Sequence, residues 1–149
     1  MSRIKLTEKA HRNLLYNLVE MESKKTLIVD QWATDLREKE EINGFFAEYF
    51  TLLDGVVKTK SIRVAATATN EFPFVAVGCN VTLQDIETES IIEFNIIPPY
   101  QEQIDFIDVS ILSPMGKALL KKGQGELITV QAPGGAFKYK ILSIIYLEQ

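Results

Sequence analysis

The spacing of apolar residues in the first 60 positions constrains the fold more than any other feature of the chain. One series recurs at alternating steps of four and three residues, with Lys25 at one intervening position: Leu14, Leu18, Met21, Ile28 and Trp32. A second series follows the same steps: Ile42, Phe46, Tyr49, Leu53 and Val56. This alternation is typical of helices that pack side by side as a left-handed coiled coil. The pattern therefore predicts two helices that face one another.

The two predicted arms cover residues 7–33 and 36–60, or 27 and 25 residues. Arms of nearly equal length predict an antiparallel hairpin about 40 Å long, at 1.5 Å per residue. We place its tip at Asp35. A turn at Asn43-Gly44 is the alternative, because that dipeptide favours turns, but it would leave much of the first apolar series without a partner. Gly44 then lies inside the second helix, at a cost of about 1 kcal/mol relative to alanine.

From about Ser61 the pattern changes to short, β-branched runs separated by turn-forming residues, and all five prolines of the chain lie in this part. The runs predict strands at residues 62–66, 75–83, 90–97, 106–112, 126–132 and 138–147. Between the fourth and fifth of these strands, Ser113 can cap a short helix that begins at Pro114 and ends before Gly123. Twelve residues are predicted to form the core of this part: Val81, Leu83, Ile92, Phe94, Ile107, Val109, Ile111, Leu119, Leu120, Val130, Ile141 and Ile144.

These patterns together predict an α+β protein. An antiparallel α-helical hairpin, residues 1–66, precedes a C-terminal domain, residues 67–149, in which an antiparallel sheet packs on one short helix.

Composition excludes several classes of protein. The chain has 16 basic and 20 acidic residues and a net charge of −4, which disfavours a protein that coats nucleic acid. Its single cysteine, Cys79, can form neither an internal disulfide nor a structural zinc site alone. No apolar run approaches the roughly 18 residues of a membrane span, and the first residues do not resemble a signal peptide. We therefore expect a cytoplasmic protein with no membrane association.

The tip of the predicted hairpin carries two carboxylates, Asp35 and Glu38. Their spacing favours a capping box, in which Asp35 begins the second helix and Glu38 supports the cap. The same pair, held at the end of a long rigid arm, could bind a divalent cation or orient a water molecule. Both roles can coexist, because a cap fixes the backbone that carries the ligands.

A combination of motifs then points to a family. Ser113-Pro114-Met115 follows a strand, continues as Gly116-Lys117 and Ala118-Leu119-Leu120, and precedes Pro133-Gly134-Gly135. Residues 109–147 thereby resemble the C-terminal domain of the bacterial transcript-cleavage factors GreA and GreB. Leu6-Thr7 and Asp35-Leu36-x-Glu38 resemble the opening and the hairpin tip of the same family.

This resemblance implies a coiled-coil hairpin and an FKBP-like C-terminal domain. It also implies that the chain docks on the rim of the RNA polymerase secondary channel through Ser113, Pro114 and Met115. Asp35 and Glu38 would then help to hold a Mg²⁺ ion and a water in the polymerase active centre, near the nascent RNA 3′ end and the template DNA. The polymerase itself would cleave the backtracked RNA, so we expect no enzymatic activity and no intrinsic cofactor in this chain, which we expect to be a monomer.

Two alternatives remain open. A non-cleaving regulator of the same fold, inhibitory or Rnk-like, would occupy the channel without assisting cleavage. Lys39, at a position where the family usually has asparagine, and arms about one heptad shorter than is typical favour this alternative. A peptidyl-prolyl isomerase is suggested only by the FKBP-like fold, and fold alone does not carry function.

Overall fold

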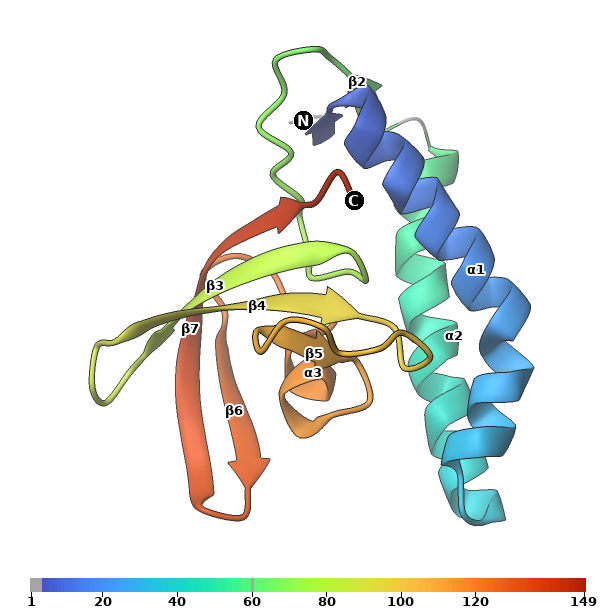
Figure 1. Ribbon diagram of the computed structural model, residues 1–149, viewed down its shortest axis with the longest axis vertical. Coiled ribbons are helices and arrows are strands. Elements are labelled where there is room, and N and C mark those ends of the chain that lie inside the picture. The colour runs from blue at the N-terminus through green and yellow to red at the C-terminus, as the bar shows by residue number, and fades with distance from the viewer. Residues whose placement is uncertain (1–3, 60) are drawn as a thin grey trace.

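Two long helices at the start of the chain form the antiparallel hairpin that the apolar spacing predicts (Figure 1). The computed structural model describes residues 4–59 and 61–149, so the predicted end of the second arm at Lys60 lies outside the described residues. In chain order the elements are β1 (Ile4–Leu6), α1 (Glu8–Trp32), α2 (Leu36–Lys58), β2 (Ile62–Val64), β3 (Cys79–Asp85), β4 (Ile91–Ile97), β5 (Asp108–Ser110), α3 (Pro114–Leu119), β6 (Leu127–Ala132) and β7 (Gly135–Tyr146).

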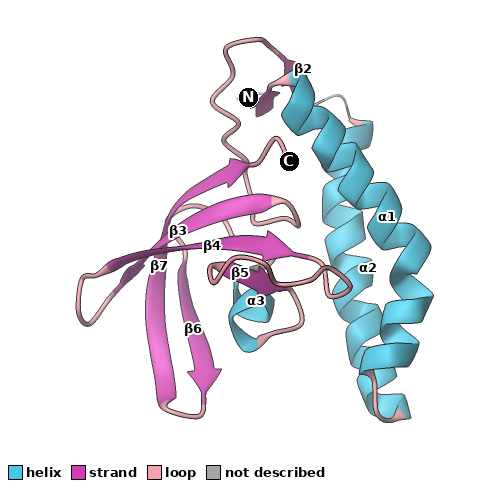
Figure 2. Ribbon diagram, viewed as in Figure 1, coloured by secondary structure: helices cyan, strands magenta, loops and turns pink. Residues whose placement is uncertain are grey.

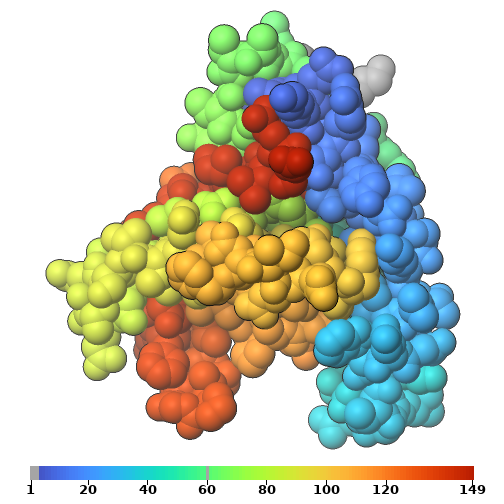
Figure 3. Space-filling model, viewed as in Figure 1, coloured from blue at the N-terminus to red at the C-terminus, as the bar shows by residue number. Residues whose placement is uncertain are grey.

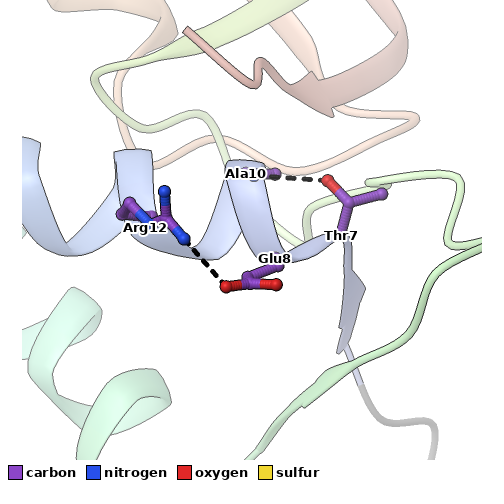
Figure 4. A network of polar contacts seen from close by, with 4 residues as sticks. All are labelled: Thr7, Glu8, Ala10 and Arg12. Carbon is purple, nitrogen blue, oxygen red and sulfur yellow. Dashed lines mark hydrogen bonds and ion pairs between the residues drawn. The ribbon is translucent and has the colours of Figure 1, made fainter.

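Helix α1 begins at a side-chain cap. The hydroxyl of Thr7 accepts a hydrogen bond of 3.2 Å from the backbone N–H of Ala10, which satisfies one of the free donors in the first turn (Figure 4). The carboxylate of Glu8 pairs with the Arg12 guanidinium one turn later, at 2.8 Å. These contacts fix where the first arm starts, one residue after the predicted boundary.

The tip of the hairpin lies where the sequence predicts it. Helix α1 ends at Trp32, Ala33 is its C-cap, and Asp35 is the N-cap of α2. Gly44 lies inside α2, so the alternative turn at Asn43-Gly44 is wrong. The long-range packing of the two apolar series outweighs the local turn preference of that dipeptide.

The seam between the helices is formed mostly by the predicted residues. Those that are buried are Leu14, Leu18, Met21, Ile28, Ile42, Phe46, Tyr49 and Leu53. Trp32 is an exception, because it is 48% exposed. It is the last residue of α1 and lies at the end of the seam.

The sheet of the C-terminal domain has the strand order β5-β4-β3-β7-β6. Three of its four strand pairs are antiparallel, and β4 pairs with β5 in parallel. A register shift between Thr82 and Leu83 bends β3 against β7. Residues 75–77, predicted as the start of a strand, instead form the buried approach to β3.

A second sheet of two strands was not predicted. β1 pairs in parallel with β2, and Ile4 lies opposite Ile62. This pair joins the start of α1 to the segment that follows α2, so it closes the open end of the hairpin (Figure 2). The run at residues 62–66 predicts the strand that is observed as β2, whereas β1 is too short for a periodicity argument to detect.

The short helix α3 begins as predicted and ends earlier. The Ser113 hydroxyl accepts a hydrogen bond of 3.1 Å from Gly116 N–H, and Pro114 occupies the first turn. The helix stops at Leu119, because Leu120 is already extended and Lys121 has a left-handed φ of 76°. A methyl group at Gly116 would collide with the carbonyl oxygen of Ser110, so this helix packs closely on the end of β5.

One continuous core joins the hairpin and the sheet. Eight of the twelve predicted core residues of the C-terminal part are buried: Val81, Leu83, Ile111, Leu119, Leu120, Val130, Ile141 and Ile144. The other four, Ile92, Phe94, Ile107 and Val109, are only half-buried. They lie on or beside β4 and β5, where the sheet ends and where the outer part of the β3–β4 ribbon extends beyond the other elements (Figure 1).

The hairpin lies along the sheet domain and is joined to it by polar contacts. The Tyr49 hydroxyl accepts a hydrogen bond of 2.9 Å from Val77 N–H, and the Tyr146 hydroxyl donates one of 2.6 Å to the Val77 carbonyl. Asn17 of α1 donates to the same Tyr146 hydroxyl at 2.9 Å. Nearer the tip, Lys121 pairs with Glu48 at 2.6 Å. These contacts leave only the tip end of the hairpin separate from the sheet domain in the space-filling view (Figure 3).

Among residues 4–59 and 61–149, no helix is both long enough and apolar enough to cross a membrane.

Candidate functional site

The hairpin tip holds its two carboxylates in a fixed arrangement. Asp35 Oδ1 accepts a hydrogen bond of 2.8 Å from Glu38 N–H. The Glu38 carboxylate turns back to Thr34, where it accepts from the backbone N–H at 3.2 Å and from the hydroxyl at 2.9 Å. The result is the predicted capping box, with the difference that Glu38 reaches the residue before the N-cap rather than the N-cap itself.

The cations near the tip are paired with carboxylates other than Asp35 and Glu38. Lys39 Nζ lies 3.4 Å from the Asp30 carboxylate on α1, and Arg37 lies 3.3 Å from Glu41 on the next turn. Because Lys39 points to α1, it bridges the two arms rather than neutralising Asp35 or Glu38. The tip therefore presents an acidic surface.

The tip offers two oxygen-donor groups and no complete metal centre. Within the described part of the chain, no three or more His, Cys, Asp or Glu side chains are grouped so that they could hold a metal ion. Carboxylate oxygens are nevertheless the ligands that Mg²⁺ prefers, and Mg²⁺ sites commonly take only one or two from a protein chain. The chemistry of Asp35 and Glu38 fits a cation whose remaining ligands come from a partner.

The predicted docking segment differs in exposure along its three residues. Ser113 is half-buried and donates its hydroxyl to the Ser110 carbonyl at 2.6 Å. Met115 is half-buried against the core, whereas Pro114 is exposed. Ser113 and Met115 therefore have a clear structural role, and Pro114 is the residue most available to a partner.

A cleft of about 430 Å³ brings the hairpin and the segment around α3 together. Its hairpin wall includes Glu38 and Trp32, and its opposite wall is formed by Leu112 and Lys117, which flank the docking segment. The sequence did not predict this cleft, because Trp32 was expected in the seam and no local pattern shows which face of α2 meets the turn before α3.

Comparisons with known proteins show the family of this chain. A family model described as "Transcription elongation factor, GreA/GreB, C-term" matches residues 69–146. The chain belongs to the GreA/GreB family.

The GreA relatives and one solved GreA/GreB structure show how far the similarity extends. The chain is 42% identical over 72 residues to transcription elongation factor GreA of Thermodesulfovibrio yellowstonii, a match that covers 48% of this chain and 46% of the relative. It is 35% identical over 97 residues to GreA of Rickettsia bellii, covering 65% and 58%. The chain thus spans about half the length of the curated GreA relatives it matches. The GreA/GreB factor of Nitrosomonas europaea has the same fold, with a TM-score of 0.54 at 20% identity over 97% of this chain and 100% of that one.

In this GreA/GreB-family chain, one cleft is lined by a predicted tip residue and by a neighbour of the predicted docking segment. Glu38 lines the same cleft as Lys117, which follows the docking segment by two residues. Asp35 and the docking residues Ser113, Pro114 and Met115 do not line this cleft, so it connects neighbours of the two sites rather than the sites themselves.

Proposed function

We propose that this chain is a Gre-type elongation factor that binds RNA polymerase in its secondary channel and stimulates cleavage of backtracked nascent RNA. The observation that carries the proposal is the pair of carboxylates, Asp35 and Glu38, fixed at the end of the hairpin in a GreA/GreB-family chain. Ser113, Pro114 and Met115 are the proposed docking segment on the channel rim.

In this proposal the chain supplies groups and the polymerase performs the hydrolysis. Asp35 and Glu38 would be ligands for a Mg²⁺ ion of the polymerase active centre, which when bound activates a water for attack on the phosphodiester. The hydrogen bond from Glu38 N–H keeps Asp35 in place. Glu38 becomes available when it exchanges its two hydrogen bonds to Thr34 for the cation. Such exposed hydrogen bonds contribute only about 0.5–1.5 kcal/mol each.

The decisive experiment separates the charge of the tip from its cap. The Asp35→Asn/Glu38→Gln double variant keeps one acceptor oxygen at each position, so residue 35 can still cap α2 through the N–H of residue 38, but it loses both negative charges. We expect wild type to accelerate RNA cleavage in a backtracked complex of the cognate polymerase. We expect the double variant to bind the polymerase with unchanged affinity and to lose stimulation on the order of 100-fold, because several kcal/mol of charge stabilisation are removed.

Glu40→Gln is the matched control, since Glu40 is an exposed carboxylate two residues from Glu38 that the proposal does not use. The Glu40→Gln variant should stimulate RNA cleavage as strongly as wild type does. Full stimulation by the double variant would contradict the proposed role of the tip.

A second candidate function is supported by specific contacts. The Glu48–Lys121 ion pair and the Tyr49–Val77 hydrogen bond hold the hairpin along the sheet domain. Both oxygens of Glu38 are already occupied by Thr34. A hairpin held along the sheet domain, with a tip carboxylate already hydrogen-bonded, favours a regulator that occupies the secondary channel without assisting cleavage. This function would be supported instead if wild type binds the polymerase and slows nucleotide addition, and if neither wild type nor the double variant stimulates RNA cleavage.

A further inference from the structure

The loop of residues 98–107, between β4 and β5, carries an apolar protrusion. Ile104 is 86% exposed and Phe106 is 90% exposed. These are the two most exposed large apolar side chains in the described part of the chain. Leaving such a side chain in water forgoes roughly 1.5–3 kcal/mol that burial would provide. Two of them separated by one residue, on one loop, indicate a surface that a partner covers.

The loop is held in this conformation by a buried carboxylate. Asp108 is only 7% exposed, and its side chain accepts hydrogen bonds from Ile104 N–H at 3.2 Å, Asp105 N–H at 3.0 Å and the Asn95 amide at 3.2 Å. The carbonyl of Asp108 accepts a further bond of 2.7 Å from the Gln103 side chain. The backbone on both sides of Ile104 is therefore anchored, and the apolar side chains project from a prepared support.

The root of the loop is anchored as well. Lys24 of α1 lies over the ring of Tyr100, 4.2 Å from its centre. Desolvation at this contact, together with the negative charge of Glu20, raises the pKa of the Tyr100 hydroxyl to about 12. The loop is thus fixed at both ends. In Figure 3 its yellow and orange atoms lie on the face turned toward the viewer, beside the hairpin.

The charge around the loop indicates the chemistry of the partner. Residues 98–107 contain two acidic side chains, Glu102 and Asp105, which flank Ile104, and no basic one. Two carboxylates beside the apolar pair disfavour RNA, DNA and anionic membranes as partners of these side chains. The loop complements a protein surface with an apolar pocket bordered by lysine or arginine.

The loop lies close to the proposed docking segment. Only β5, three residues long, separates it from the turn that leads to Ser113. At about 3.3 Å per residue, β5 spans about 10 Å. A standard protein interface covers roughly 800 Å² on each partner, which is wide enough to include both ends of such a strand.

We infer that Ile104 and Phe106 form an apolar anchor of this chain. The anchor inserts into an apolar pocket on RNA polymerase that is bordered by lysine or arginine side chains, next to the proposed contact of residues 113–115. This inference rests on the proposed function, because it names the same partner. It assigns a binding role to the loop of residues 98–107, which the proposed function does not use.

The test is a binding titration of full-length chain with cognate RNA polymerase core enzyme at low and moderate salt. The Ile104→Ala/Phe106→Ala variant should raise Kd at least tenfold with an unchanged melting temperature, since both side chains are outside the core. Leu127→Ala is the matched control, because Leu127 is a 69% exposed leucine on β6, at the opposite edge of the sheet. Its Kd should stay within twofold of wild type.

Glu102→Lys provides a second test that removes no apolar contact, and Glu102 is exposed. It should weaken binding more at low salt than at moderate salt, while Glu102→Gln should have a smaller effect.

Wild-type affinity of the Ile104→Ala/Phe106→Ala variant would overturn the inference and leave the proposed function intact. Failure of wild type to bind polymerase would overturn both. A change in self-association by sedimentation, with polymerase affinity unaltered, would assign the anchor to a second copy of the chain and overturn the inference.

Discussion

Asp35 contributes both a hydrogen bond and a charge at the tip, and the two contributions are separable. Its carboxylate caps α2 through Glu38 N–H, as the spacing of the two residues in sequence predicts. A capping role alone would explain why the sequence has Asp35 and Glu38 there. Residue-level chemistry therefore supports the cap directly, and the cation-binding role stays a prediction.

Substitutions at Asp35 should distinguish the two contributions in the free protein. Asp35→Ala should lower the free energy of unfolding by about 1 kcal/mol, because Glu38 N–H loses its acceptor. Asp35→Asn should change it by less than about 0.5 kcal/mol, because asparagine caps helices almost as well. Guanidinium denaturation of both variants and wild type measures this difference. Equal losses for both variants would show that charge, rather than the hydrogen bond, stabilises this helix end.

At the scale of elements, α2 contains a glycine that its packing does not require. Gly44 lies in the helix interior, and a methyl group added there would meet no atom within 4 Å. Asn43-Gly44 favours a turn locally, but the packing of α2 against α1 outweighs this preference. Helix propensity is weak beside the burial of a full apolar face.

Gly44→Ala should stabilise the protein by about 0.5–1 kcal/mol, since alanine loses less backbone entropy in a helix. Gly125→Ala is the matched control, because that site is equally open but has a left-handed φ of 86°. It should be destabilising. Thermal melts of both variants test the pair, and a loss of stability in Gly44→Ala would mean that α2 needs flexibility at this point.

At the scale of the whole molecule, the hairpin and the sheet share buried hydroxyl and thiol groups. Burial raises the pKa of the Cys79 thiol from 9.0 to about 12. Burial also raises the pKa values of the Tyr49 and Tyr146 hydroxyls, which join α1, α2 and the sheet through Val77. These groups remain protonated in the folded chain at physiological pH.

The raised pKa values predict alkaline destabilisation. The folded state holds these protons more tightly than the unfolded state, so their contribution is complete below about pH 9 and falls as pH rises toward 12. The free energy of unfolding from guanidinium titrations should therefore be clearly lower at pH 11 than at pH 8. Reaction of Cys79 with a thiol reagent at pH 8 should occur only after unfolding. Equal stability at both pH values would contradict burial of these groups.

The sequence by itself determined those parts of the fold that depend on neighbouring residues. The heptad-like series fixed both helices, the Asp35 and Ser113 caps fixed two helix starts, and turn residues separated the strands. The motifs at residues 113–118 and 133–135 were sufficient to indicate the GreA/GreB family. These signals are local because hydrogen bonding and side-chain periodicity within one element are local.

Tertiary structure decided everything that depends on which segments meet. The pairing of β1 with β2, the exposure of Trp32, and the cleft that joins Glu38 to Lys117 have no signature within a short window of sequence. The exposure of Ile104 and Phe106 is of the same kind, since apolar residues next to a strand are expected to be buried. Burial is a property of two surfaces in contact, and a single segment encodes only one of them.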